Sequence, residues 1–140
     1  MELSSFFANS DLSGVLCMES ASHLNRQSTF PSLPVMVFAP LPRDYNMGYL
    51  QMYAQAELDL RFTRKVGHGL YLTSPERTIV DLLRFDREER VLFESLDRYL
   101  REHRNTNALL KVAKEYGCLN ELKQRIVELD EWLSEFYEHG

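Results

Sequence analysis

Apolar residues in the second half of the chain recur every three or four positions, which is the spacing of one face of an α-helix. This spacing predicts a C-terminal run of about four helices, over residues 74–85, 87–103, 106–116 and 119–137. The first of these helices has the clearest start, because Ser74 can cap it and Pro75 suits its first turn. Gly117 is typical of a residue that follows the last turn of a helix, so it separates the final two.

In the first half of the chain the spacing changes to that of β-strands. A continuous apolar run from Leu33 to Ala39 predicts a strand that is covered on both faces. Apolar and polar residues then alternate over 50–73, including 58–62, which predicts three or four mostly antiparallel strands with one face against helices. The segment Gly67-His68-Gly69 predicts a hairpin turn between the last two strands.

The N-terminal part is predicted to be helical over residues 2–25, in two pieces, of which the second runs from Val15 to Leu24. The polar segment 25–34 contains prolines and predicts a loop. The predicted order is an N-terminal helix, a small mostly antiparallel sheet of three to five strands, and the helical run. This segregation predicts an α+β fold. The chain has 140 residues, so we expect a single domain over 1–140.

Composition and charge narrow the possible functions. The chain is 44% hydrophobic and 26% charged, which is typical of a soluble globular protein. Its formal net charge of -5 argues against a protein whose whole surface binds nucleic acid. Cys17 and Cys118 are far apart and lie in apolar surroundings, so we expect reduced, buried thiols. The sequence has no basic leader and no membrane-length apolar stretch, so we expect a cytoplasmic protein without a membrane partner.

The sequence does not contain the common catalytic and cofactor motifs. It has no glycine-rich phosphate loop and no Gly-x-Ser-x-Gly turn. Its four histidines and two cysteines are not spaced as zinc ligands are. The sequence therefore predicts a non-enzymatic protein, with no catalytic residue, no cofactor and no metal site.

Three acidic and basic residues in helical segments are candidates for function. Arg77 and Asp81 are four residues apart, so they can touch on one face of the predicted helix. Asp81 lies beside the apolar stripe, and a partly buried carboxylate needs a partner. Two interpretations remain open: an ion pair that fixes the helix, or a direct functional contact. Glu19 is either a capping or solvated residue or a lone functional acid.

Basic residues gather between 61 and 104, where acidic residues are interleaved with most of them. A solvated surface of mixed charge is one interpretation. Arg61, Arg64 and Lys65 are less diluted by acids and lie near a predicted sheet edge, so they are candidates for a small basic contact surface. Segment 128–138 is acidic, and this tilt of charge could steer a charged partner or keep the protein soluble.

Two segments resemble the C-terminal domain of AbiEi-type antitoxins, from the type IV toxin–antitoxin systems of bacteria. Gly14 to Leu24 resembles the opening helix of that domain, and Leu72 to Leu83, with its Ser-Pro-Glu-Arg-Thr motif, resembles its passage from strand to helix. The resemblance covers roughly residues 12–130. It implies an antitoxin that opposes a nucleotidyltransferase-like toxin or its target in abortive infection and phage defence, with no stable complex required. The residues matched to the motifs are Glu19, Arg77 and Asp81.

Antitoxins of this family usually carry an N-terminal winged helix that binds promoter DNA. The chain begins about a dozen residues before the opening helix, so winged-helix DNA binding is not expected. An alternative hypothesis is a phage or mobile-element protein that binds and inhibits a host defence complex, where an acidic last helix would mimic nucleic acid. A third hypothesis, an enzyme that acts on nucleotides or RNA, has little support because no acid–base or metal constellation stands out.

Overall fold

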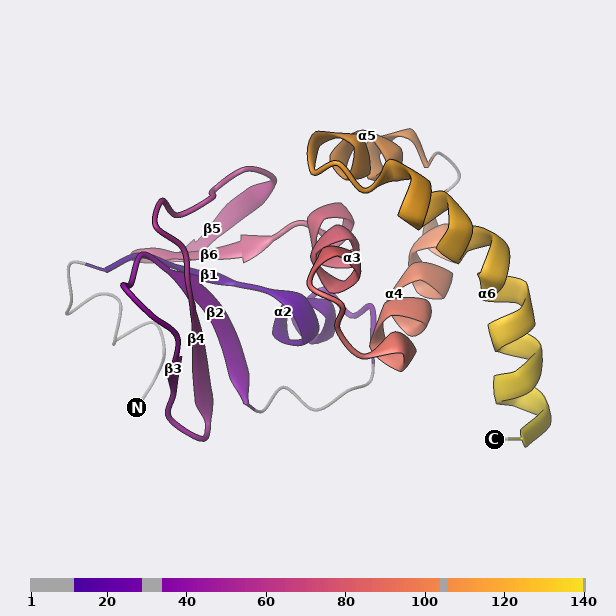
Figure 1. Ribbon diagram of the computed structural model, residues 1–140, viewed down its shortest axis with the longest axis horizontal. Helices are drawn as coiled ribbons and strands as arrows, with labels where there is room; N and C mark the ends of the chain where they lie inside the picture. The colour runs from indigo at the N-terminus through magenta and orange to yellow at the C-terminus, as the bar shows by residue number, and fades with distance from the viewer. Residues whose placement is uncertain (1–11, 29–33, 104–105, 140) are drawn as a thin grey trace.

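The computed structural model describes residues 12–28, 34–103 and 106–139. In these residues a six-stranded sheet lies beside a group of helices, which confirms the α+β class (Figure 1). The strands are β1 (Gly14–Leu16), β2 (Val35–Ala39), β3 (Tyr45–Asn46), β4 (Leu50–Ala54), β5 (Thr63–Gly67) and β6 (Leu70–Thr73). The helices are α2 (Met18–Leu24), α3 (Pro75–Arg84), α4 (Glu89–Glu102), α5 (Asn107–Glu115) and α6 (Leu119–His139). The four C-terminal helices are therefore confirmed.

The sheet has the order β3-β4-β2-β1-β6-β5 and is mixed. The pairs β1–β2, β3–β4 and β5–β6 are antiparallel, whereas β1–β6 and β2–β4 are parallel. The prediction of three to five strands was therefore too low. The parallel pairs arise because the chain leaves the sheet after β1, β2 and β4, and returns beside a strand that is not its sequence neighbour.

The prediction of a helix from Val15 to Leu24 was wrong at its start. Val15 and Leu16 belong to β1, and α2 begins only at Met18. On one side Val15 faces Phe38 of β2, and on the other it faces Tyr71 of β6. Hydrogen bonds and burial on both sides therefore outweigh the helical spacing of these residues. The first predicted helical piece, near residue 2, lies outside the described residues.

The predicted strand over 58–62 is absent from the described sheet, because this segment is a loop between β4 and β5. Its alternating pattern has no partner strand, and Leu60 is 42% exposed. Phe62 has a φ of +54°, which is incompatible with an extended strand. The hairpin after it is confirmed, since Gly67 pairs with Leu70 and Gly69 has a positive φ of +67°.

Alternation along the strands places apolar side chains on both faces of the sheet. Val15 and Phe38 face the helices and join the main core with Ile79, Leu82 and Leu96. A smaller cluster contains the neighbouring strand positions, among them Leu16, Val37, Leu50, Met52, Leu70 and Leu72. Both cysteines are buried and free, as predicted.

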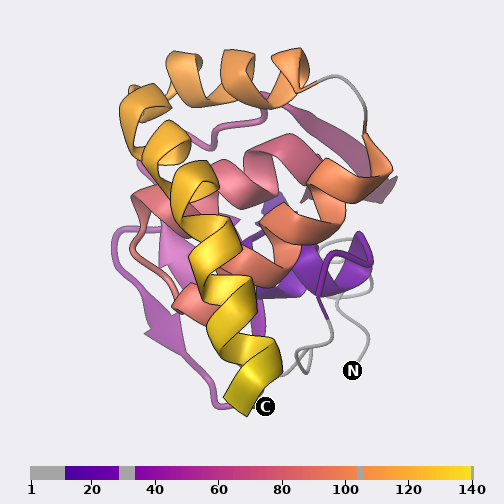
Figure 2. The same ribbon diagram turned by 90° about the vertical axis from the view of Figure 1, so that its right-hand side faces the viewer.

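Helix α6 covers the outer side of the helical group. It contacts α3, α4 and α5, and Figure 2 shows it crossing in front of α3 and α4. Leu122 and Leu129 are the buried residues through which it joins the core. None of the helices in the described ranges combines the length and apolar character needed to cross a membrane.

Ser74 caps α3 as predicted, because its hydroxyl accepts a hydrogen bond from the amide of Arg77 at 3.1 Å. The end of α3 is a Schellman motif: the amide of Arg87 donates to the carbonyl of Leu82 at 2.9 Å. Asp86 occupies the left-handed position of this motif, with a φ of +51°. The same hydrogen-bond pattern ends α2 and α5, where the left-handed residues are Arg26 and Gly117.

Candidate functional site

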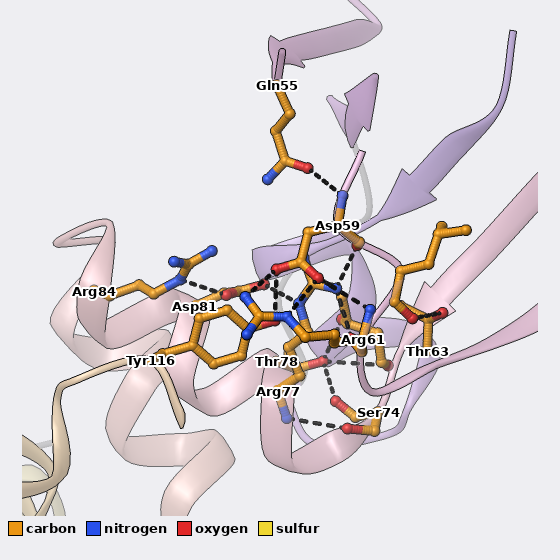
Figure 3. Close-up of polar contacts among 12 residues, drawn as sticks. Gln55, Asp59, Arg61, Thr63, Ser74, Arg77, Thr78, Asp81, Arg84 and Tyr116 are labelled. Carbon is orange, nitrogen blue, oxygen red and sulfur yellow. Dashed lines mark hydrogen bonds and ion pairs between the residues drawn. The ribbon is translucent and has the colours of Figure 1, made fainter. Parts of the chain in front are cut away.

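Arg77 is the centre of a buried polar network that joins α3 to the loop before β5 (Figure 3). Its side chain is 0% exposed. The Nε atom donates to Oδ2 of Asp81 at 3.2 Å, one turn along the helix. Nη1 donates to the carbonyl oxygens of Asp59 and Arg61 at 2.7 and 2.8 Å. The arginine therefore provides the hydrogen bonds that a partner strand would otherwise give this loop.

Asp81 lies between two arginines and is itself fully buried. Its Oδ1 accepts a hydrogen bond from Nε of Arg84 at 2.8 Å, while Oδ2 serves Arg77. Burial raises the pKa of Asp81 above its usual value, although both guanidinium groups act in the opposite direction. One carboxylate therefore neutralises two cations, which leaves a local excess of positive charge.

Asp59 is the second acidic member of the network. Its carboxylate accepts hydrogen bonds from Nε and Nη2 of Arg61 and from the hydroxyl of Tyr116 at 2.8 Å. Burial acts to raise the pKa of Asp59, but the hydrogen bonds from Arg61 and Tyr116 outweigh it and hold this pKa well below its usual range. Burial and the bond to Asp59 raise the pKa of Tyr116 to about 12. Asp59 therefore remains charged and ties the loop to the end of α5.

The structure brings together the sequence-predicted pair Arg77 and Asp81, but places both inside the fold. Because neither side chain is exposed, a partner cannot touch them without opening the molecule. Of the two interpretations left open by the sequence, the geometry favours the structural ion pair. Nη2 of Arg77 is buried and has no hydrogen-bond partner among the described residues. It lies in a guanidinium stacked near the rings of Phe38 and Tyr116, at 5.8 and 5.7 Å.

Glu19 forms a separate ion pair with Arg87. Both Nε and Nη2 of Arg87 donate to its carboxylate, at 2.9 and 2.7 Å for the shortest contacts. The Glu19 side chain is 12% exposed, so it is neither a cap nor a solvated residue. The Schellman motif after α3 turns the chain so that Arg87 reaches back to α2. Glu19 and Asp81 each have their own arginine partners and do not form a carboxylate pair.

The three candidate contact residues lie close in sequence but have different surroundings. Arg61 is tied to Asp59, lies 3.7 Å from Glu115, and stacks on Tyr116 at 4.5 Å. Arg64 and Lys65 are exposed on β5 and form no ion pair with another described residue. Arg64 pairs with Leu72 and Lys65 with Tyr71, so their side chains point to opposite faces of the sheet.

A cavity of about 440 Å³ lies beside the network. Its floor and walls come from α2, β2, β4 and the end of α3. Two cations, Arg84 and Arg87, contribute to the lining. The other residues that line it are Met18, Phe38, Asp44, Tyr53, Ala54, Gln55 and Phe85.

Sequence reasoning missed Asp59, Tyr116, Arg84 and Arg87 as members of these clusters. The spacing of Asp81 and Arg84, three residues apart on one helix, was a signal that could have identified Arg84. The other contacts span 57 residues from Asp59 to Tyr116 and 68 residues from Glu19 to Arg87. No local pattern reports contacts of that length.

Comparison with protein families, curated proteins and solved structures gave no match to this chain. The described residues contain no group of three or more His, Cys, Asp or Glu side chains placed to hold a metal ion. Cys17 lies next to the start of α2, and burial raises the pKa of its thiol well above the usual value. This thiol is therefore protonated and poorly nucleophilic at neutral pH.

Proposed function

We propose that this chain is a cytoplasmic, non-enzymatic binding domain with an antitoxin-like role, which opposes a nucleotidyltransferase-like toxin in phage defence. The observation that carries the proposal is the edge strand β5 with its two exposed cations, Arg64 and Lys65. We propose that this edge recognises an acidic, extended segment of the toxin or of its target.

The outer edge of β5 has no neighbouring strand in the described sheet, so its backbone amides and carbonyls can accept a further strand. Arg64 and Lys65 lie on opposite faces of that edge and would flank the added strand on both sides. Two copies of β5 paired with each other would bring like charges together, which is unfavourable. The chemistry therefore favours an acidic partner over a second copy of this chain.

The buried motif residues support this role indirectly. Arg77 holds the carbonyls of Asp59 and Arg61, immediately before β5 begins at Thr63. The amide of Ser74 also donates to the carbonyl of Phe62 at 2.8 Å. The segment that resembles the antitoxin family thus fixes the position of β5. In this proposal the motif shapes the contact surface without being part of it.

Co-expression with a nucleotidyltransferase-like toxin tests the proposal. The unmodified chain is expected to restore growth, and the double variant Arg64→Glu, Lys65→Glu is expected to lose that protection because it reverses the charge of the edge. The control reverses two exposed lysines elsewhere, Lys111→Glu and Lys123→Glu, and should protect fully. Thermal unfolding confirms that each variant is folded. Unchanged toxicity with the original chain, or full protection by the edge variant, would contradict the proposal.

A second candidate function is the inhibition of a host defence complex through the acidic side of α6. The supporting observation is a shallow pocket of about 220 Å³ between α4 and α6. At its base Phe93 and Trp132 stack with ring centroids 5.3 Å apart. Four carboxylates surround it, from Glu89, Glu128, Glu131 and Glu135.

This second function predicts a partner that normally binds nucleic acid. Tagged protein incubated with a host lysate should capture a defence protein, and added DNA should displace it from the tagged chain. The double variant Glu131→Lys, Glu135→Lys should lose the partner, whereas Arg64→Glu, Lys65→Glu should keep it. Capture that DNA does not affect would exclude nucleic-acid mimicry.

A further inference from the structure

The cavity between α3 and β4 is built from cations and aromatic rings. Its volume of about 440 Å³ falls within the usual range for small-molecule sites. We propose that it binds a mononucleotide, through its phosphate and its base. This proposal concerns a different surface from β5 and does not depend on the antitoxin-like role.

Arg84 supplies the first argument, because its guanidinium is held in place with most of its donors unused. Nε is fixed by Oδ1 of the buried Asp81 at 2.8 Å. The guanidinium also lies over the rings of Phe85 and Tyr116, at 4.5 and 4.3 Å from their centroids. Figure 3 shows its two terminal nitrogens on the side away from Asp81.

Those terminal nitrogens make no hydrogen bond to another described residue, and the side chain is 26% exposed. A planar fork of N–H donors matches the oxygens of a phosphate or carboxylate. Because Asp81 and the two rings already restrict the side chain, little further entropy is lost when an anion binds. The site is therefore preorganised for one anionic group.

Arg87 adds a second cation on the same cavity. Glu19 orients it through Nε and Nη2, and its guanidinium lies 5.8 Å from the ring of Tyr53. Asp81 is shared by Arg77 and Arg84, so these ion pairs contain three arginines and only two carboxylates. The positive charge that remains attracts an anion to the cavity.

Aromatic rings supply the other half of the recognition. Phe38 and Phe85 lie 5.4 Å apart at an angle of 47°, and Phe38 also contacts Tyr53 edge-on. Phe85 is 43% exposed although it lines the cavity, so its ring is available for stacking on a flat aromatic group. A nucleobase is such a group, and stacking on aromatic side chains is how proteins commonly hold one.

Polar groups suited to a sugar or base complete the lining. The side-chain oxygen of Gln55 accepts the amide of Asp59 at 3.1 Å, which directs its NH₂ group elsewhere. Oδ1 of Asp44 accepts the amide of Ala54 at 2.7 Å, which leaves its second oxygen without a described partner. A nucleotide has both acceptors for the NH₂ group and hydroxyl or amino donors for the carboxylate. An anion with an aromatic ring and polar groups between them thus fits this lining better than a plain anion does.

Isothermal titration calorimetry tests the proposal with the four ribonucleoside monophosphates, adenosine, inorganic phosphate and a short single-stranded RNA. At least one monophosphate is expected to bind. Adenosine and inorganic phosphate should each bind about tenfold more weakly or worse, since each lacks one of the two contacts. Tighter binding of the RNA than of any monophosphate would assign the cavity to an RNA end instead of a free nucleotide.

Two variants and a control locate the binding. Arg84→Gln should weaken binding about tenfold or more by removing the fork. Phe85→Leu should weaken it through lost stacking, and this variant leaves the ion pair with Asp81 intact if Arg84→Gln fails to fold. Arg64→Gln, a change of an exposed arginine outside the cavity, should bind as the original chain does. The absence of binding by every monophosphate, or equal affinity in Phe85→Leu, would overturn the proposal.

Discussion

At the scale of single residues, Arg77 has the largest structural role in the described chain. It joins a helix carboxylate to two backbone carbonyls of a loop that has no strand partner. A lysine could not replace it, because one ammonium group lacks the planar arrangement of donors that reaches all three acceptors. The identity of this residue is therefore set by geometry and not by charge alone.

We expect Arg77→Ala to lower the free energy of unfolding by about 3–5 kcal/mol, because it leaves Asp81 and two carbonyls buried without their donor. Arg77→Lys should recover only part of that loss. Urea denaturation followed by circular dichroism measures both. Arg64→Ala is the control and should change the free energy by no more than about 0.5 kcal/mol. A loss below about 1 kcal/mol for Arg77→Ala would mean that the network does not hold the fold.

The sequence allowed part of this cluster to be predicted. The pair Arg77 and Asp81 was predictable because their spacing is a property of one helix. Asp59 was not, since it meets Arg77 across 18 residues through a backbone carbonyl, and any residue type can supply that group. Whether the pair was structural or exposed could not be deduced either, because burial depends on what packs over the helix.

At the scale of elements, three described helices end in the same hydrogen-bonded turn, but only one of them has glycine there. A Cβ atom placed on Gly117 would meet no other atom within 4 Å, so its φ of +73° is the only feature that requires glycine. Arg26 and Asp86 adopt the same left-handed conformation with φ of +59° and +51°. These two turns store backbone strain that a glycine would relieve.

Gly117→Ala should lower the free energy of unfolding by about 1 kcal/mol, since the methyl group meets no neighbour and only the backbone is penalised. Arg26→Gly should have the opposite sign and raise it by up to about 1 kcal/mol, less the hydration or contacts of the lost side chain. Thermal and urea denaturation of both variants provide the measurement. A stabilising Gly117→Ala would show that the left-handed turn is not kept in solution.

The elements that sequence predicted well were those whose own pattern decides them. The C-terminal helices carry their apolar stripe and their caps within one segment. Strand β1 was mistaken for helix because three apolar residues are too short to show a period, and only β2 and β6 make them a strand. The loop 58–62 was mistaken for a strand because its alternation was real while its partner was a guanidinium.

At the scale of the whole molecule, Asp59 links three parts that are distant in sequence: its own loop, Arg77 of α3 and Tyr116 at the end of α5. The charged form of Asp59 makes these bonds. Its low pKa therefore couples the protonation of one carboxylate to the packing of sheet and helices. Neither the sheet order nor this link was predictable, because both depend on which distant segments meet.

We expect acid to destabilise the protein through Asp59. Its pKa is lower in the folded state than in the unfolded chain, so below pH about 4 the unfolded chain takes up a proton first. The free energy of unfolding should therefore fall as pH falls from about 4 towards the folded pKa. Asp81, with a raised pKa, contributes in the opposite direction just above that range.

Urea denaturation at several pH values between about 2 and 7 measures this dependence. Asp59→Asn should be less stable than the original chain at neutral pH and should lose less stability on acidification. Asp44→Asn, an exposed carboxylate on another loop, should follow the original curve. Parallel curves for Asp59→Asn and the original chain would assign the acid sensitivity to other groups.

Strand β1 lies in the middle of the sheet although it precedes both of its neighbours along the chain. During synthesis on a ribosome, Val15 therefore emerges long before Phe38 and longer still before Tyr71, its two cross-strand partners. Until then both edges of β1 are open, and the growing chain cannot complete a stable sheet. Pairing across such separations also slows folding. A nascent chain that stalls before β6 would thus expose a short apolar strand, which makes this interval the one in which chaperones would matter most.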